Sequence, residues 1–141
     1  MKKHASAHWQ GNLKQGKGTI STESGVLSAN PYGFNTRFEY TPGTNPEELI
    51  GAAHAGCFSM AFSMLLGEEG FTPDSIDTKA TVTLDKVDDG FAITAVHLLM
   101  KATIPKIDQA AFQTIANKAK AGCPVSKLLN ADITLDATLS N

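Results

Sequence analysis

The feature that most constrains this chain is an uncharged run in its middle. Residues 49–66 contain no Asp, Glu, Lys or Arg over 18 positions, a length at the lower limit for a transmembrane helix. However, the run contains His54 and several glycines, serines and alanines, and glutamates flank both of its ends. A membrane span usually has basic flanks and an aromatic belt. We therefore expect no membrane span, but a helix of a soluble protein that is buried on nearly every side.

Both ends of this helix carry local signals. Asn45 is a good N-cap residue, Pro46 suits the first helical position, and Glu48 completes a capping box. Gly70 provides a stop, so we predict a helix over residues 45–69. A sheet covers only one face of such a helix, and its small residues suit close packing against another helix. In so short a chain, this second helix is expected to be the same helix of another copy, in an isologous homodimer.

The remaining segments predict a single α+β domain over residues 1–141. Glycines break the N-terminal part into short extended segments, and Asp88-Asp89-Gly90 is a strong hairpin signal between two alternating apolar segments. The predicted elements are a β-meander (1–42, with strands at 7–13, 17–22 and 34–40), the central helix (45–69), a β-hairpin (75–104), helices (108–130) and a final strand (132–139).

Composition excludes several classes of function. The chain has 141 residues, a formal net charge of −2, and Arg37 as its single arginine, so it lacks the clustered cations of a nucleic-acid surface. The first residues contain no apolar stretch of a secretory signal. We therefore expect a cytoplasmic protein, in a reducing compartment where a pair of cysteines is more often catalytic, metal-binding or redox-active than a permanent disulfide.

The two cysteines, Cys57 and Cys123, have different local surroundings. Cys57 lies in the middle of the long helix, where the helix dipole does little for its thiol, so a nearby cation must lower its pKa. The candidates are His54, three residues earlier, and Arg37. For His54, a structural role as a core or interface histidine is the preferred interpretation. Cys123 precedes Pro124 at a predicted helix start, where free amides favour a thiolate.

The same residues allow other interpretations. The two cysteines could be unrelated buried thiols, because free cysteine is among the most buried residue types. A zinc site could use His54, Cys57 and Cys123, but no paired-ligand spacing such as CxxC is present. A Cys–His hydrolase lacks any recognisable orienting residue or oxyanion motif. We expect no bound metal and no resident cofactor.

Two segments resemble the OsmC/Ohr family. They are GTNPEELIGAAHAGCFS at residues 43–59 and AKAGCPVS at 119–126. The likeness extends across essentially the whole chain, and the segments KGT (17–19), STESGVL (21–27) and PYGFNTRF (31–38) resemble the OsmC branch of osmotically inducible proteins. In the Ohr branch the active-site arginine lies early in the first hairpin; here that region has only lysines, so the role falls to Arg37.

The resemblance implies a thiol-dependent peroxidase that reduces organic hydroperoxides, and hydrogen peroxide less well, in oxidative and osmotic stress. It implies an OsmC-like fold in which antiparallel sheets of two intertwined subunits wrap the long helices. By resemblance, Cys57 is the peroxidatic thiol, Cys123 the resolving thiol, and Arg37 with Glu48 the activating couple. The reductant it implies is an external dithiol such as dihydrolipoamide, commonly on a lipoylated protein.

The implied chemistry suits these residue types. Attack by the Cys57 thiolate on the peroxide leaves a sulfenic acid, which Cys123 converts to a disulfide that a dithiol reduces. The fixed donors of Arg37 suit both a thiolate and a peroxide oxygen. Glu48 is nine residues from Cys57, about 13.5 Å along a helix. An arginine oriented by Glu48 is therefore expected to meet Cys57 of the other subunit, giving composite active sites.

Two further questions remain open from the sequence. An apolar wall for bulky hydroperoxides could come from Phe34, Phe38, Phe58 or Met60, each of which could equally be core. A function of another class, a non-catalytic stress-induced binding or redox-sensing protein, would use the cysteines without turnover. Peroxide consumption by the wild type and by Cys57→Ser separates the two.

Overall fold

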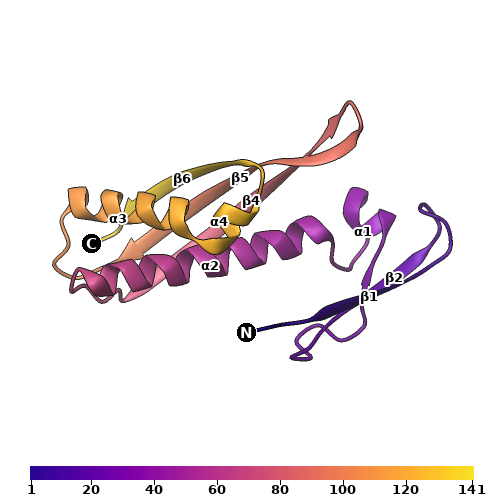
Figure 1. The fold of residues 1–141 in the computed structure, drawn as a ribbon, viewed down its shortest axis with the longest axis horizontal. Helices are drawn as coiled ribbons and strands as arrows, with labels where there is room; N and C mark the ends of the chain where they lie inside the picture. Colours follow the sequence, from indigo (N-terminus) through magenta and orange to yellow (C-terminus); the bar gives the residue numbers. More distant parts are fainter. The chain divides into compact units, whose positions relative to one another are not determined.

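A computed structural model describes all residues, 1–141, and it divides into two compact units, Met1–Leu49 and Ile50–Asn141. The elements in chain order are β1 (Ala5–Gln10), β2 (Lys17–Thr22), β3 (Asn30–Tyr32), α1 (Phe34–Phe38), α2 (Pro46–Glu68), β4 (Ser75–Val87), β5 (Gly90–Thr103), α3 (Gln109–Gly122), α4 (Pro124–Leu128) and β6 (Asp132–Leu139) (Figure 1). This is the α+β content that the sequence predicts.

The first unit is built on a small antiparallel sheet of order β1-β2-β3. Gly18 on β2 permits a close aromatic contact, because a Cβ there would lie 2.3 Å from the Tyr32 ring and 2.8 Å from Trp9. The strand predicted over residues 34–40 is wrong: α1 occupies this segment. Thr36 explains the helical turn, since its hydroxyl accepts a hydrogen bond from the Gly33 amide, and Arg37 N donates to the Gly33 carbonyl.

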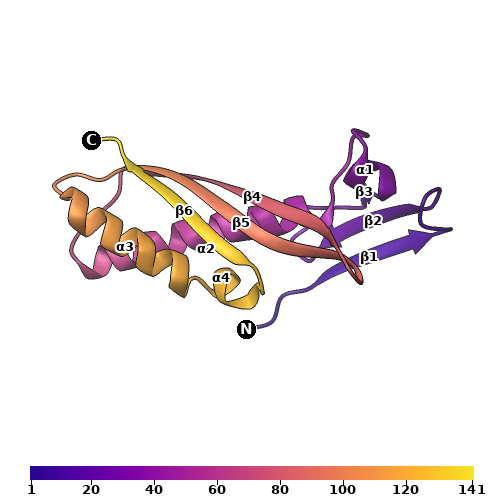
Figure 2. The ribbon, with the colours of Figure 1, turned by 90° about the horizontal axis from the view of Figure 1, so that it is seen from above.

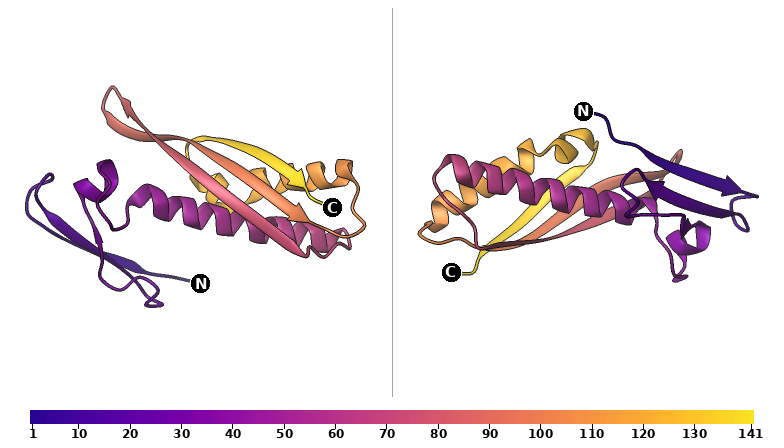
Figure 3. Two further views of the ribbon diagram at one scale, coloured as in Figure 1. Left: turned by 180° about the vertical axis from the view of Figure 1, so that it is seen from behind. Right: turned by 90° about the horizontal axis from the view of Figure 1, so that it is seen from below.

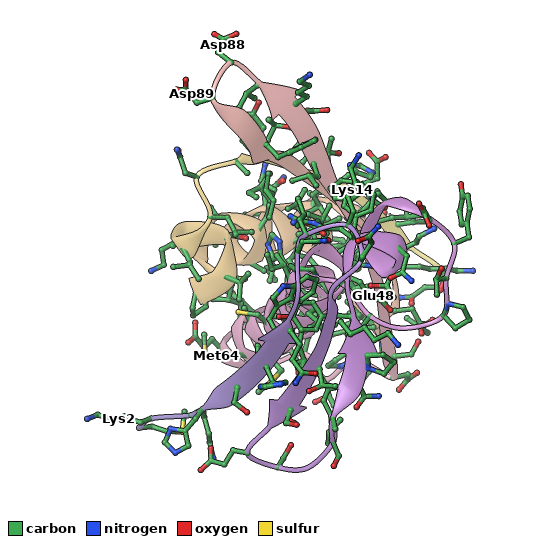
Figure 4. All side chains as sticks on the ribbon, turned by 90° about the vertical axis from the view of Figure 1, so that its right-hand side faces the viewer. Lys2, Lys14, Glu48, Met64, Asp88 and Asp89 are labelled. Atoms are coloured by element: carbon green, nitrogen blue, oxygen red, sulfur yellow. The ribbon has the colours of Figure 1, made fainter.

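The second unit has a sheet of order β4-β5-β6, with β4 and β5 antiparallel and β5 and β6 parallel. Strand β6 pairs only with Ala95–Ala102 of β5, so the β4–β5 hairpin continues beyond β6 to its tip (Figure 2). Asp88 and Asp89 form this tip and point away from the rest of the unit in Figure 4. The predicted hairpin at 75–104 and final strand at 132–139 are confirmed.

One face of this sheet carries the hydrophobic core. Alternate residues of β5 are buried and pack against α2 and α3, which lie on the same face (Figure 3). Phe62 of α2 meets Phe112 of α3 edge to face, with ring centroids 5.8 Å apart. Burial of large aromatic rings at such a junction is the main favourable contribution to packing these helices on the sheet.

Helix α2 confirms the predicted central helix to within a residue at each end, and Gly70 adopts the positive φ of +83° expected of a helix stop. By length and composition it is the one helix of the structure that could cross a membrane, and 28% of its apolar window is buried within the chain. Its buried stripe consists of Gly51, His54, Phe58, Phe62 and Leu66. The opposite side is open, and Met60 and Met64 there are 76% and 60% exposed (Figure 4 labels Met64).

Candidate functional site

The structure brings the two cysteines together. Cys57 of α2 and Cys123, the junction residue between α3 and α4, are both reduced, and their Sγ atoms are 3.1 Å apart. This separation is about 1 Å longer than a disulfide bond, so a small movement joins the sulfurs. Sixty-six residues separate the two cysteines in the sequence, and the packing of α3 beside α2 is what places them next to each other.

The backbone at Cys123 explains its position. Cys123 closes α3 as the C-cap residue and opens α4 as the N-cap residue, in an extended conformation with φ −61° and ψ 133°. Pro124 occupies the first turn of α4, as its fixed φ favours. The side chain is fully buried, so its sulfur faces α2 and not solvent.

Hydrogen bonds dominate the chemistry of Cys123. Burial raises the pKa of its thiol. Hydrogen bonds with the Ser126 amide, the Cys57 sulfur, the Ser126 hydroxyl and the Val125 backbone together lower it by more, so the net pKa lies below its ordinary value. The Ser126 amide and hydroxyl are 3.4 and 3.6 Å from Sγ. This bears out the expectation that Cys123 has the more acidic thiol of the two.

Cys57 shows the opposite behaviour. Burial raises the pKa of its thiol, and the neighbouring Cys123 raises it further, while a hydrogen bond from the Val125 backbone only partly offsets these effects. None of these contributions comes from a cation. Within Ile50–Asn141 the net effect is therefore a raised pKa of Cys57, which a positive charge near the sulfur would lower.

His54 does not supply that charge. It is fully buried, and burial lowers the pKa of its ring, so the imidazole is neutral at pH 7. Its Nε2 is 2.7 Å from the Ser126 hydroxyl, on the side of Cys123. The prediction that His54 is a core histidine is confirmed. Of the two cations considered for Cys57, only Arg37 remains a candidate.

Arg37 of α1 forms an ion pair with Glu47 in the first turn of α2, within Met1–Leu49. Its Nε is 3.1 Å from Oε2 and its Nη2 is 2.5 Å from Oε1, a two-point contact. The Glu47 side chain is only 13% exposed and that of Arg37 34%. The guanidinium also lies over the Phe38 ring, 5.4 Å from its centroid. The arginine fork is therefore held on two sides.

The partner of Arg37 differs from the sequence expectation, which assigned Glu48. Glu48 is instead occupied with the helix start: its amide donates to Asn45 Oδ1 at 2.8 Å, and its carboxylate accepts from Asn45 Nδ2 at 3.3 Å. These are the contacts of the capping region. Adjacent helical residues point about 100° apart, so only one of the two glutamates faces α1.

An apolar pocket of about 80 Å³ lies beside Arg37 in the first unit. It is lined by Trp9, Leu13, Tyr32, Gly33, Phe34, Arg37, Phe38 and Pro46. Of the four apolar-wall candidates, Phe34 and Phe38 line this pocket, with ring centroids 4.9 Å apart. Phe58 is fully buried in the core of the second unit, and Met60 is exposed on α2. Trp9 was missed, since a lone tryptophan in a strand carries no site signal.

No group of three or more His, Cys, Asp or Glu side chains is arranged to hold a metal ion. His54, Cys57 and Cys123, the ligands of the alternative zinc site, therefore do not form one. Within Ile50–Asn141 two sulfurs are in contact, and within Met1–Leu49 a two-point arginine–glutamate pair lies beside an apolar pocket. The pair of sulfurs is suited to thiol redox chemistry.

Comparison with known proteins agrees with this class. The chain matches the sequence model of the family described as "OsmC-like protein" over residues 39–138. Peroxiredoxin OsmC of Escherichia coli (strain K12) is 65% identical over 139 residues, covering 99% of this chain and 97% of that protein. Organic hydroperoxide resistance protein OhrB of Bacillus subtilis (strain 168) is 33% identical over 122 residues, covering 84% of this chain and 88% of that protein.

Solved structures share the fold. The crystal structure of OhrB of Bacillus subtilis superposes with a TM-score of 0.75 at 28% identity, covering 96% of this chain and 98% of that one. The chain therefore belongs to the OsmC-like protein family, as the two cysteine segments indicated. It has an OsmC/Ohr fold and is a cysteine-based peroxidase.

Proposed function

We propose that this peroxidase reduces organic hydroperoxides to alcohols, and hydrogen peroxide less well, through a Cys57–Cys123 disulfide. The observation that carries the proposal is the 3.1 Å separation of the two sulfurs. The Cys57 thiolate attacks the terminal peroxide oxygen, the O–O bond breaks, and the alkoxide leaves as an alcohol after taking a proton. Cys57 is then a sulfenic acid. Cys123 attacks its sulfur, the S–O bond breaks, and water leaves with the disulfide formed.

Arg37 is the activating cation in this proposal. Its two-point pair with Glu47 fixes the guanidinium plane, and the remaining donors are available to a thiolate and to a peroxide oxygen. The raised pKa of Cys57 within its own unit supports the need for such a cation. Glu47 thus takes the orienting role that the sequence analysis gave to Glu48.

The active sites are proposed to be composite, in a homodimer. Ten residues of α2 separate Glu47 from Cys57, about 15 Å of helical rise, so Glu47 does not reach Cys57 of its own helix. A second subunit removes this difficulty, and the exposed apolar side of α2 with Met60 and Met64 supports such packing. The symmetric dimer then has two equal sites, each with residues of both chains.

The substrate class follows from the pocket beside Arg37. Aromatic side chains surround it, so a hydroperoxide with an alkyl or aryl group buries apolar area there that hydrogen peroxide lacks. The relatives named for organic hydroperoxide resistance support the same class.

An external dithiol, dihydrolipoamide free or on a lipoylated protein, reopens the disulfide. A reducing compartment, the cytoplasm, suits that step.

The proposal is tested by turnover with a panel of peroxides and reductants. We expect tert-butyl and cumene hydroperoxide to give higher kcat/KM values than hydrogen peroxide, and dihydrolipoamide to support faster cycling than glutathione. Mass spectrometry after one equivalent of peroxide is expected to find the Cys57–Cys123 disulfide. Equal peroxide consumption by wild type and Cys57→Ser would contradict the proposal and favour the non-catalytic binding or sensing role.

Subunit complementation tests the composite sites. Arg37→Met is expected to be nearly inactive and Cys57→Ser inactive, but a mixed dimer contains one site with both wild-type residues. Random refolding of an equal mixture should therefore recover roughly a quarter of wild-type turnover. The matched control mixes Cys57→Ser with the double variant Arg37→Met/Cys57→Ser and should recover nothing. No recovery in the test mixture would place Arg37 and Cys57 of one site on the same chain.

A further inference from the structure

His54 and Ser126 connect the helix that bears Cys57 to the sulfur of Cys123. His54 lies in the buried stripe of α2, where its neighbours Gly51 and Phe58 are core residues. Its Nε2 is 2.7 Å from Ser126 Oγ, and this oxygen is 3.6 Å from Cys123 Sγ. All three side chains belong to Ile50–Asn141, and both His54 and Cys123 have no exposed surface. A polar ring in an apolar stripe costs free energy unless it is hydrogen-bonded, and Ser126 is the partner that it has.

The direction of these hydrogen bonds follows from the ring. Burial keeps His54 neutral, so the ring carries one proton, on Nδ1 or on Nε2. Nδ1 is buried and has no partner. Because an unpaired buried N–H is rarer in proteins than an unpaired acceptor, the tautomer with the proton on Nε2 is the favoured one. That N–H then donates to Ser126 Oγ, and the single hydroxyl proton of Ser126 is left to donate elsewhere.

We propose that His54 is a positioning residue for the resolving thiol, which acts through Ser126: His54 Nε2–H donates to Ser126 Oγ, and the Ser126 hydroxyl donates to Cys123 Sγ. This arrangement favours the thiolate of Cys123, because a charged sulfur accepts a stronger hydrogen bond from the hydroxyl than a neutral thiol does. His54 fixes the Ser126 hydroxyl in the orientation in which its proton points at Cys123 Sγ. The relay therefore serves Cys123, although His54 is only three residues from Cys57.

The relay affects the two steps of the cycle in which Cys123 reacts. Attack of Cys123 on the Cys57 sulfenic acid requires the thiolate, forms the S–S bond and breaks the S–O bond, and the hydroxide that leaves takes a proton to become water. In the later reduction of the disulfide, a dithiol attacks the sulfur of Cys57 and Cys123 leaves. Cys123 is a better leaving group when its thiolate is stabilised, which favours this step. The step at Cys57 with peroxide precedes any use of the relay. This inference rests on the proposed resolving role of Cys123.

The first test isolates Cys123 from the peroxidase reaction. In a Cys57→Ser background, Cys123 is the only thiol, and its titration is followed by the ultraviolet absorbance of the thiolate. We expect Ser126→Ala and His54→Leu to raise the pKa of Cys123. His54→Gln is the conservative control: its amide nitrogen reaches a similar position and donates, but does not titrate, so it should retain most of the wild-type value.

A double variant separates the relay from a packing effect. Because His54 acts through Ser126, His54→Leu should add little to the shift that Ser126→Ala already causes. Additive shifts, or an unchanged thiol pKa in Ser126→Ala, would overturn the proposal. Ser126→Ala removes only a hydroxyl and keeps the backbone amide that caps α4, so it decides the matter even if His54→Leu does not fold.

The second test uses the intact chain with both cysteines. After a single equivalent of cumene hydroperoxide, the rate of disulfide formation relative to peroxide consumption should fall about tenfold in Ser126→Ala and His54→Leu, the loss expected for one hydrogen bond to a charged group. Over-oxidised Cys57 should then accumulate at lower peroxide concentrations. An unchanged ratio would overturn the relay. If the wild type itself forms no disulfide, the proposed function fails, and the titration alone decides the role of His54.

Discussion

The two cysteine sulfurs differ in the hydrogen-bond donors that surround them. At the α3–α4 junction, Cys123 is fully buried and still has a lowered pKa, because amides and a hydroxyl of α4 point at it. In the middle of α2, Cys57 is partly exposed, and yet its pKa is raised. Burial alone would predict the reverse order. The comparison shows that local hydrogen-bond donors, more than exposure, decide which thiol of the pair is acidic.

The difference also shows what the Cys57 region lacks. The thiol that is expected to meet peroxide has a backbone donor that does not offset its burial, while the single arginine of the chain, Arg37, is paired with Glu47 in Met1–Leu49. In the proposed composite site, activation of Cys57 depends on an arginine that the partner subunit supplies.

The largest expected effect comes from exchanging the two sulfurs for oxygen, one at a time. Cys57→Ser should lose peroxide consumption entirely, whereas Cys123→Ser should complete one turnover and then stall or over-oxidise, because no resolving thiol follows. Consumption of tert-butyl hydroperoxide with dithiothreitol, followed from the first turnover onward, measures both. A first turnover in Cys57→Ser would assign the peroxidatic role to Cys123 and reverse the comparison.

The next effect concerns the cation. Arg37→Met should lower kcat/KM about a hundredfold, the loss typical of removing one preorganised charge or donor. Glu47→Gln should lower it about tenfold, because the guanidinium loses a charge-assisted contact.

Glu48→Gln is the matched control for Glu47. It should leave kcat/KM within about twofold and lower stability by less than about 1 kcal/mol, because Glu48 contributes only to the cap of α2. If Glu48→Gln is the more damaging variant, the couple is the one first expected from the sequence, and not the one in the structure.

A smaller effect shows whether His54 is a neutral buried histidine or a cation near Cys57. Because burial lowers its pKa from 6.5 in the folded state, the unfolded chain binds a proton below that pH that the folded chain does not. Stability should therefore fall as the pH falls through 6.5, by at most about 1.4 kcal/mol per pH unit for one proton. His54→Gln removes this contribution, so the two urea-denaturation stabilities should converge at acid pH. A constant difference between them would mean that His54 keeps its ordinary pKa and could be a cation near Cys57.

The sequence predicted the elements that have local signals. Asn45, Gly70 and the Asp88-Asp89-Gly90 turn each act within a few residues, and the helix and hairpin that they bound are present. The segment at 34–40 was missed because α1 depends on one hydroxyl, that of Thr36, which folds back on Gly33. Alternating aromatic residues there suggest a strand, but a single side-chain contact selects the turn.

The candidate site divides in the same way. The cysteine pair was identified by resemblance and lies together in the structure, but the choice between Glu47 and Glu48 depends on which helical direction faces α1, which adjacent identical residues do not reveal. The contact of His54 with Ser126 spans 72 residues and had no sequence signal at all. Tertiary packing creates it, because α4 has to be placed on α2 first.

The most direct test of the account is the thiolate titration of each cysteine alone, with and without Arg37. Cys123→Ser leaves Cys57 as the only thiol, and Cys57→Ser leaves Cys123. The account predicts that Arg37→Met raises the apparent pKa of Cys57 in the first protein and leaves that of Cys123 unchanged in the second. If Arg37→Met shifts both thiols equally, or leaves the pKa of Cys57 where it was, the division of labour between the two sulfurs is contradicted.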